Sequence, residues 1–423
     1  MPQSLEDQKK LYAELLIKIG VNLQPDQGLW ISTELAHREF VRLVVAEAYR
    51  AGAKYVHVDW ADPISAKNRY LHGKPESLDY VPEWQVGMLR EMVQDKWARL
   101  AIIGEEYPNL MDDIDPAVVR RAAVARAQKT RFYSEATMSN QMQWCVAAVP
   151  TTNWARKVLP NLSEEKAVAR LWELILSTVR VDAADPVQAW RDHDHRLNAV
   201  VRFMASNAVR AVRFLDPTPA EDGTPSTDLT VGLTDAPVWI AASSDTPAGV
   251  NFLPNMPTEE VFSTPHRLRV HGHVRTSKPG FPLGHEVNSA YFRFERGELA
   301  EYRAAKGEDT LRQFFDIDGA RHLGEVALVD VRSPINQSGA LFYNTLFDEN
   351  AVCHVAFGRA YPDGMQGATA MSEAERTEAG VNDSHTHCDL MIGTPSMHVY
   401  GLRADGSQVP VMENGQFVAA VFA

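Results

Sequence analysis

A change of pattern near the middle of the chain constrains its fold more than any other feature. In the first half, stretches of helical periodicity alternate with short apolar runs, which is typical of βαβ units around a parallel sheet. The pattern predicts helices over 5–19, 35–49 and 82–97, and strands over 29–31, 55–59, 100–104 and 144–149. The first half is therefore predicted to be an α/β domain with a mostly parallel sheet.

A different pattern follows a helical stretch over residues 162–207. Within that stretch, Ser163 and Asp185-Pro186 carry the cap and first-turn signals that open helices. Beyond the Pro, Asp and Gly-rich segment 216–227, the sequence changes to short apolar runs. Strands are predicted over 229–233, 238–242, 268–274 and 290–294. The second half is therefore expected to be mixed α+β and rich in strands.

The length of the chain supports a division into two domains. With 423 residues it exceeds the size at which one hydrophobic core usually stops growing. We expect an N-terminal α/β domain over residues 1–207, including the bridging helices, and a strand-rich C-terminal domain over residues 208–423. Hydrophobic residues at 45% and charged residues at 23% are ordinary for globular proteins, so the chain can bury an adequate core.

The composition argues against two classes of partner. The sequence contains no apolar run near the roughly 20 residues that a bilayer-spanning helix needs, so no membrane partner is expected. A formal net charge of −13 repels nucleic acid, and no basic stripe with interleaved aromatic residues offsets it. Nucleic acid is therefore not expected as a partner either.

The N-terminal segment and the cysteines predict the compartment. The first ten residues are polar and lack the basic and apolar regions of a signal peptide. The three cysteines, Cys145, Cys353 and Cys388, are odd in number and widely spaced, which fits a reducing environment better than a disulfide framework. A cytoplasmic protein is therefore expected.

The segment Asn382–Gly393 carries the clearest chemical signal. Alternate residues of a strand point to the same side, so His385, His387 and Asp389 would share one face. The apolar run after Asp389 provides a buried anchor, and a metal site needs such rigidity to keep its geometry. The segment therefore predicts a site for a divalent cation.

Further carboxylates and an imidazole occur in the second half of the chain. They are Glu259, Glu260, Glu325 and His354. A mixed set of oxygen and nitrogen ligands suits zinc, cobalt or manganese. Two ions close together would need a shared carboxylate and about two further ligands each. Taken alone, these residues leave metal binding and chance occurrence both open.

Four segments of the second half form a recognisable set: Asn255–Phe262, Leu323–Leu328, Ser338–Tyr361 and Asn382–Gly393. Their order and spacing resemble those of peptidase family M29, the thermophilic-type metallo-aminopeptidases. The similarity extends into the first half through Asp59–Asp62 and Tyr133–Asn140. It therefore covers nearly the whole chain.

The resemblance implies two divalent metal ions per chain, and the family leaves zinc, cobalt, magnesium and manganese open. The matching ligand positions are Glu260, Glu325, His354, His387 and Asp389. Tyr361, seven residues after His354, matches a catalytic side chain of the family. Glu325 is expected to combine metal ligation with proton transfer.

Neighbouring residues have competing interpretations. The family usually carries an apolar residue at the position of His385, so this histidine is expected around the site or at the surface. Glu260 is preferred over Glu259 because the family's ligand directly precedes the Val-Phe step. Asp348 and Glu349 are expected to be turn residues or caps, with proton acceptance as the alternative role.

The resemblance implies hydrolysis of the N-terminal residue from peptides by a water that two metal ions activate. It also implies a homodimer, a preference for apolar N-terminal residues, and peptides with a free N-terminus as partners. The alternative is a single-iron, ring-cleaving dioxygenase on the related scaffold, for which two histidines and one carboxylate suffice. The presence of Glu260, Glu325 and Tyr361 argues against that alternative. A non-enzymatic protein on this scaffold would have lost its ligand positions, which are all present here.

Overall fold

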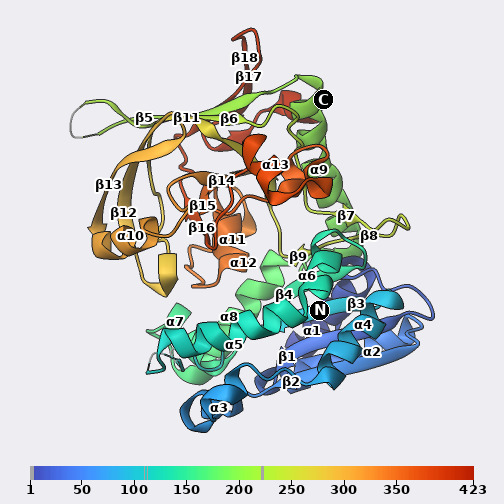
Figure 1. Cartoon of the computed structure of the whole chain (residues 1–423). Coiled ribbons are helices and arrows are strands. Elements are labelled where there is room, and N and C mark those ends of the chain that lie inside the picture. Colours follow the sequence, from blue (N-terminus) through green and yellow to red (C-terminus); the bar gives the residue numbers. More distant parts are fainter. Residues whose placement is uncertain (1–3, 109, 112, 221–222) are drawn as a thin grey trace. The chain divides into compact units, whose positions relative to one another are not determined.

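The chain divides into two compact units. The computed structural model describes residues 4–108, 110–111, 113–220 and 223–423 (Figure 1). Unit 1 comprises Met1–Arg191 and Ser243–Pro257, and unit 2 comprises Asp192–Ala242 and Thr258–Ala423. Whereas the sequence suggested a boundary after residue 207, this division falls within helix α9 (Pro186–Ser206) and assigns residues 243–257 to unit 1.

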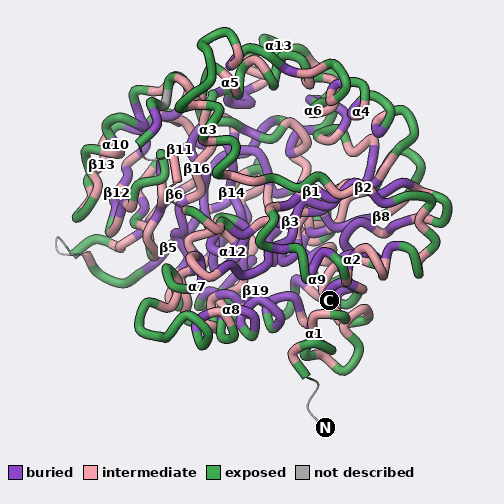
Figure 2. The backbone as a smooth tube through the Cα atoms, turned by 90° about the horizontal axis from the view of Figure 1, so that it is seen from below, coloured by how far each residue is buried: buried purple, intermediate pink, exposed green. Residues whose placement is uncertain are grey.

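Unit 1 contains a five-stranded sheet whose neighbouring strands all pair in parallel, in the order β2-β1-β3-β4-β9. The strands are β1 (Gly28–Glu34), β2 (Tyr55–Ala61), β3 (Ala98–Ile103), β4 (Trp144–Ala148) and β9 (Asn255–Met256). Strands covered on both faces are apolar, and the fully buried Leu29, Ile31 and Leu100 follow this rule. Figure 2 shows the tube along β1 and β3 mostly buried. The expected N-terminal α/β domain with a parallel sheet is confirmed.

Helices precede and connect the strands of unit 1. They are α1 (Leu5–Leu15), α2 (Arg38–Arg50), α3 (Pro63–His72), α4 (Glu83–Gln94), α5 (Pro116–Lys129), α6 (Arg131–Met138), α7 (Thr152–Val158), α8 (Glu164–Thr178) and the first part of α9. Helix α9 begins at a side-chain cap, because Asp185 accepts the N–H of Gln188 at 3.0 Å. The helix predicted over 5–19 is α-helical only to Leu15, after which a π-helical turn follows over Leu16–Gly20. Among the described residues, no helix has the length and apolar character to cross a membrane.

Unit 2 is rich in strands, as expected, and its larger sheet has eight antiparallel strands in the order β13-β12-β11-β6-β5-β17-β18-β19. These are β5 (Ala211–Pro219), β6 (Pro225–Leu233), β11 (Pro265–Arg275), β12 (Asn288–Glu295), β13 (Glu298–Lys306), β17 (His398–Leu402), β18 (Gln408–Glu413) and β19 (Gln416–Phe417). The strands predicted over 229–233, 268–274 and 290–294 lie within β6, β11 and β12. The shorter helices are α10 (Glu308–Phe315), α11 (Pro334–Gln337), α12 (Thr345–Asp348) and α13 (Glu373–Glu378).

The strand predicted over 238–242 is wrong. This segment forms only one isolated bridge, from Ile240 to Phe262, and Pro237 just before it forms another with Met365. The segment is apolar because it is part of the core: Trp239 and Ala242 are only 6% and 5% exposed. A proline cannot donate a ladder hydrogen bond, so pairing at Pro237 does not extend into a strand.

The smaller sheet of unit 2 has four antiparallel strands in the order β10-β14-β15-β16. They are β10 (Glu260–Ser263), β14 (Leu323–Val329), β15 (His354–Gly358) and β16 (His387–Met391). One face of this sheet packs on the larger sheet, since the ring of Phe357 lies 5.0 Å from that of Phe292 and 5.5 Å from that of Phe294. Figure 1 shows β14, β15 and β16 beside one another. The opposite face is free to carry polar side chains.

Candidate metal centre

Four candidate ligands of the second half lie on β14, β15 and β16, where the strand register brings them together. Glu325 and Asp389 both pair with Ala356, which lies between them on β15. His387 pairs with Gly358, two residues further along the same strand. Directly paired residues and alternate residues of a strand point to the same side of a sheet. Glu325, His387 and Asp389 therefore share one face.

The same reasoning places the remaining two candidates on that face. His354 is two residues before Ala356 and pairs with Ala327. Ala327 also pairs with Phe262 on β10, and Glu260 lies two residues before Phe262. Glu260 and His354 therefore point to the side that Glu325 occupies. This face is opposite to the one that packs on the larger sheet.

Small residues at the centre and at the end of β15 leave room between the acidic side chains. Gly358 has a φ of +100°, and a Cβ there would lie 2.2 Å from the carbonyl oxygen of Thr386. Glycine is therefore required at this position for both its backbone conformation and its lack of a side chain. Ala356, between Glu325 and Asp389, adds only a methyl group to the face.

Glu260, Glu325 and His354 form the first of two ligand groups. His354 Nε2 lies 3.3 Å from Glu260 Oε2 and 3.4 Å from Glu325 Oε1. One potential ligand atom of each residue lies within 4.8 Å of those of the other two. All three side chains are buried, so a cation held here would have little competition from bulk water.

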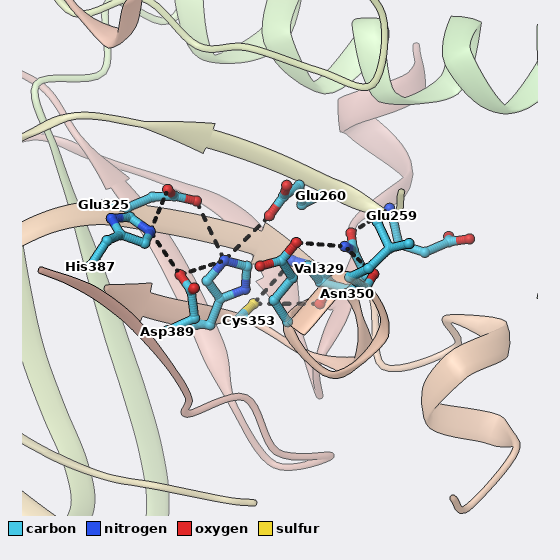
Figure 3. Close-up of polar contacts among 11 residues, drawn as sticks. Glu259, Glu260, Glu325, Val329, Asn350, Cys353, His387 and Asp389 are labelled. Atoms are coloured by element: carbon cyan, nitrogen blue, oxygen red, sulfur yellow. Dashed lines mark hydrogen bonds and ion pairs between the residues drawn. The ribbon is translucent and has the colours of Figure 1, made fainter. Parts of the chain in front are cut away.

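Glu325, His387 and Asp389 form the second group (Figure 3). His387 Nε2 lies 3.6 Å from Glu325 Oε2 and 3.2 Å from Asp389 Oδ1. Glu325 thus belongs to both groups and turns one oxygen toward each histidine. This is the arrangement of a carboxylate that bridges two neighbouring cation positions.

Burial of this negative charge shifts the titration of the first group. Burial raises the pKa of Glu325 to about 6, and the charges of Glu260 and Asp389 act in the same direction. Burial alone lowers the pKa of His354, but the Glu260 and Glu325 carboxylates outweigh it and raise that pKa well above its ordinary value. The site therefore attracts positive charge, which either protons or metal cations can supply.

His387 is oriented by a hydrogen bond from its other ring nitrogen. Its Nδ1 lies 2.8 Å from the carbonyl oxygen of Arg359, and because a carbonyl only accepts, Nδ1 carries the proton. Burial lowers the pKa of His387, but Asp389 and Glu325 raise it to about 9. Burial also raises the pKa of Asp389, but its hydrogen bond with His387 outweighs this and leaves that pKa lowered. Nε2 of His387 thus faces two carboxylates.

The buried polar atoms fit a bound cation. Within the described residues, Glu260 Oε2 and both ring nitrogens of His354 have no hydrogen-bond partner. Glu260 Oε2 and His354 Nε2 lie 3.3 Å apart, but their relative orientation does not make a hydrogen bond. Such unsatisfied buried atoms are rare, because each costs about 1–3 kcal/mol. Three carboxylates and two imidazoles also form a donor set that suits divalent ions.

Tyr361 lies at the more accessible end of the site. Its ring is 5.2 Å from that of His387 and 5.9 Å from that of Phe262. Tyr361 is 43% exposed, and the side chains of His387 and His354 are 24% and 1% exposed. Partial burial, followed by the charges of Glu325 and Asp389, raises the pKa of Tyr361, so the phenol keeps its proton at neutral pH. A molecule approaching the site would meet Tyr361 and His387 first.

Two neighbouring residues do not join the ligand groups. His385 is exposed and precedes β16, which begins at His387, so the prediction that it shares the strand face is wrong. The chain is not yet in the sheet at His385, and the alternation of a strand does not apply there. Glu259 lies 3.5 Å from His193 instead, which leaves Glu260 as the member of the acidic pair that faces the site.

The two acids near His354 differ in their surroundings. Asp348 accepts the N–H groups of Phe342 and Asn344 at 2.8 and 3.0 Å, the role expected of a turn residue. Glu349 belongs to neither ligand group, yet its pKa is raised well above the ordinary value, first by burial and then by the charges of nearby carboxylates, foremost Asp389. The only signal in the sequence was its position five residues before His354.

The acidic, histidine-containing face is of the kind that holds divalent ions in metalloproteins. The family model of the thermophilic metalloproteases (M29) matches residues 5–417 of this chain. The chain therefore belongs to the M29 family of metalloproteases.

Individual relatives agree with this assignment. Aminopeptidase T of Thermus thermophilus is 40% identical over 407 residues, which cover 96% of this chain and 97% of the relative. Aminopeptidase 2 of Geobacillus stearothermophilus is 37% identical over 407 residues, which cover 96% of each chain. The structure of wild-type AmpT from Thermus thermophilus matches with a TM-score of 0.88 at 37% identity, over 98% of this chain and 100% of that one.

Proposed function

We propose that this chain is a metallo-aminopeptidase that removes N-terminal residues from peptides, using a water activated between two divalent ions. The family and the similar aminopeptidases support the hydrolase, and nothing in these comparisons supports the ring-cleaving dioxygenase. The observation that carries the two-ion proposal is the position of Glu325. Its two oxygens lie 3.4 Å from His354 Nε2 and 3.6 Å from His387 Nε2.

We assign one ion to Glu260, Glu325 and His354, and the other to Glu325, His387 and Asp389. Two such ions would lower the pKa of a shared water from 15.7 towards roughly 7 and polarise the scissile carbonyl. The mixed oxygen and nitrogen donors leave zinc, cobalt, magnesium and manganese as candidates. Unit 2, which contains all these residues, is accordingly our candidate for the catalytic domain.

Tyr361 and Glu349 are the candidates for the remaining chemistry. The Tyr361 phenol, protonated at neutral pH, would donate a hydrogen bond to the oxyanion that develops on the scissile carbonyl. Glu325 was expected to transfer protons as well, but both its oxygens already face histidines. Glu349 lies outside both ligand groups, so we assign its carboxylate to accept the proton of the attacking water and deliver it to the leaving amine.

A homodimer in the cytoplasm, acting on peptides with a free N-terminus, completes the proposal. Three cysteines that are all free thiols support a reducing compartment. The homodimer and the preference for apolar N-terminal residues rest on the family resemblance. Sedimentation of the purified protein tests the dimer directly, and a panel of aminoacyl anilides tests the preference.

The proposed activity is tested by removing and restoring the metal. Dialysis against a chelator should abolish hydrolysis of aminoacyl anilides, and adding back zinc, cobalt, magnesium or manganese singly should restore it. His387→Ala should lose most of the activity and one of two bound ions. The matched variant His385→Ala should keep its activity and both bound ions, because His385 is exposed and outside the ligand groups.

Two results would contradict the proposal. If neither the chelator nor His387→Ala affects cleavage of the anilides, the proposal of a metallopeptidase is wrong. One iron per chain by elemental analysis, with oxygen-dependent ring cleavage, would favour the dioxygenase.

A further inference from the structure

The backbone immediately before Glu260 is held by two side chains from distant parts of unit 2. Asn350 Oδ1 accepts the backbone N–H of Glu259 at 2.7 Å (Figure 3). His193 Nε2 lies 2.9 Å from the carbonyl oxygen of Thr258 and therefore donates to it. These bonds fix Thr258 and Glu259, the two residues that immediately precede β10.

The side chain of Asn350 is fully buried, and its contacts fix the orientation of its amide. Oδ1 faces an N–H group that can only donate, whereas Nδ2 lies 3.2 Å from the Leu346 carbonyl oxygen, which can only accept. Nδ2 also lies 3.4 Å from Glu349 Oε1. The backbone carbonyl oxygen of Asn350 also accepts a hydrogen bond, from the hydroxyl of Ser333 at 2.7 Å. Asn350 therefore has one defined position and one defined orientation.

Glu260 has few other restraints that could set the position of its carboxylate. It is the first residue of β10, a strand of four residues, and its backbone pairs with Val329 of β14. Its Oε2 has no hydrogen-bond partner within the described residues. The direction in which the side chain leaves the backbone therefore depends on the segment that leads into Glu260, and Asn350 holds the Thr258–Glu259 peptide of that segment.

We propose that Asn350 is a positioning residue that fixes the backbone leading into Glu260 and the side chain of Glu349 relative to each other. The inference rests on the proposed function, because it assigns Asn350 to the ion held by Glu260. One amide thereby joins two segments 91 residues apart, one with a metal ligand and the other with the proposed proton acceptor. Neighbours that orient metal ligands in this way typically change metal affinity about 10–100-fold when they are removed.

Cobalt titration of the metal-free protein tests the proposal without relying on activity. Wild type should bind two Co²⁺ ions. Asn350→Ala should weaken one binding step about 10–100-fold and leave the other unchanged, because His387 and Asp389 are held by β16. Hydrogen exchange at the Glu259 amide should also become faster in this variant.

Two further variants separate positioning from a general loss of packing. Asn336→Ala is the matched control. The side-chain amide of Asn336 donates one hydrogen bond to the Val331 carbonyl oxygen at 2.8 Å, and Asn336 lies outside both ligand groups. This control should retain both binding steps and the protection of the Glu259 amide. Asn350→Asp keeps the acceptor for Glu259, so it should protect that amide better than Asn350→Ala does.

The outcomes distinguish this inference from the proposed function. If wild type binds fewer than two Co²⁺ ions, the two-ion proposal fails. If wild type binds two, but Asn350→Ala weakens both steps equally or neither, the role of Asn350 is overturned. Should Asn350→Ala fail to fold by circular dichroism, Asn350→Asp decides: a Glu259 amide as unprotected as in the unfolded chain would overturn the proposal.

Discussion

The roles proposed for single residues of the site are of two kinds, holding charge and donating hydrogen bonds. Glu325 faces both histidines and belongs to both ligand groups, whereas His387 belongs only to the second group. The Tyr361 ring packs against that of His387 in a T-shaped arrangement, and its hydroxyl carries no charge at neutral pH. Substitutions at these positions should therefore give distinguishable results.

Glu325→Gln should weaken the binding of both ions, because the neutral amide cannot bridge two cations. His387→Ala should weaken only one. Activity should fall with metal content in both variants, by about 100-fold or more at fixed metal concentration. Titration with Co²⁺ provides the measurement, and two undisturbed binding steps in Glu325→Gln would rule out the bridging role.

Tyr361→Phe should lower kcat about 10²–10³-fold, the usual effect of removing one oxyanion donor. The phenylalanine ring can retain the contacts with His387 and Phe262, which are 5.2 and 5.9 Å away. Metal content should therefore remain at two ions per chain, and KM should change little. Steady-state kinetics with parallel metal analysis checks this prediction, which an unchanged kcat would contradict.

The strand β15 shows how an element can determine a site to which it contributes a single ligand. Its residues Ala356 and Gly358 pair with Asp389 and His387 and leave space between the acidic side chains. The spacing of the two ligand groups is thus a property of the backbone. Changes to this strand should affect stability and metal binding together.

Gly358→Ala should destabilise the protein by roughly 2–4 kcal/mol, because it combines an unfavourable φ of +100° with a clash against Thr386. Gly367→Ala is the matched control, since Gly367 has a φ of +79° but no atom of the described structure within 4 Å of an added Cβ. The control should lose only about 1 kcal/mol. Urea unfolding measures both, and equal losses would show that the Thr386 contact is unimportant.

The sequence predicts elements better than it predicts their pairing. Apolar runs located β1, β3 and β4, which are mostly buried, and also β2, in which only Val56 is buried. The same reasoning failed at residues 238–242, which contain buried residues but do not form the continuous hydrogen bonding of a β-strand. It also extended the strand of His387 back to His385, because alternation alone does not show where a strand enters its sheet.

The site itself depends on register, which periodicity does not reveal. Nothing in the sequence alone indicates that Glu325 and Asp389 flank Ala356, or that Glu260 reaches the same face through β14. Family resemblance provided those five positions together. It gave no comparable signal for Glu349 or Asn350, whose proposed roles rest on burial and hydrogen bonding.

The stability of the metal-free protein as a whole should depend on pH, and divalent metal ions should counteract its loss at high pH. The metal-free site takes up protons, because the pKa of His387 is raised to about 9 and that of Glu325 to about 6. A raised pKa in the folded state stabilises it at lower pH, and that stabilisation is lost as pH rises through the folded value. For His387 the window lies between about pH 6.5 and 9.

The metal-free protein should therefore lose on the order of 3 kcal/mol of stability between pH 6.5 and 9 through His387. Divalent ions should restore stability most strongly at the alkaline end, where they compete with fewer protons. Thermal unfolding across this range provides the measurement. His387→Ala should flatten the slope and His385→Ala should not; a slope that is identical in all three proteins would refute the assignment.

The distribution of the ligands along the chain has a consequence for biosynthesis. Glu260 and Asp389 lie on the two outer strands of the four-stranded sheet, although a long stretch of sequence separates them. A ribosome must therefore pass Asp389 before the proposed metal pair can assemble. Until then, translation would keep the growing polypeptide catalytically silent.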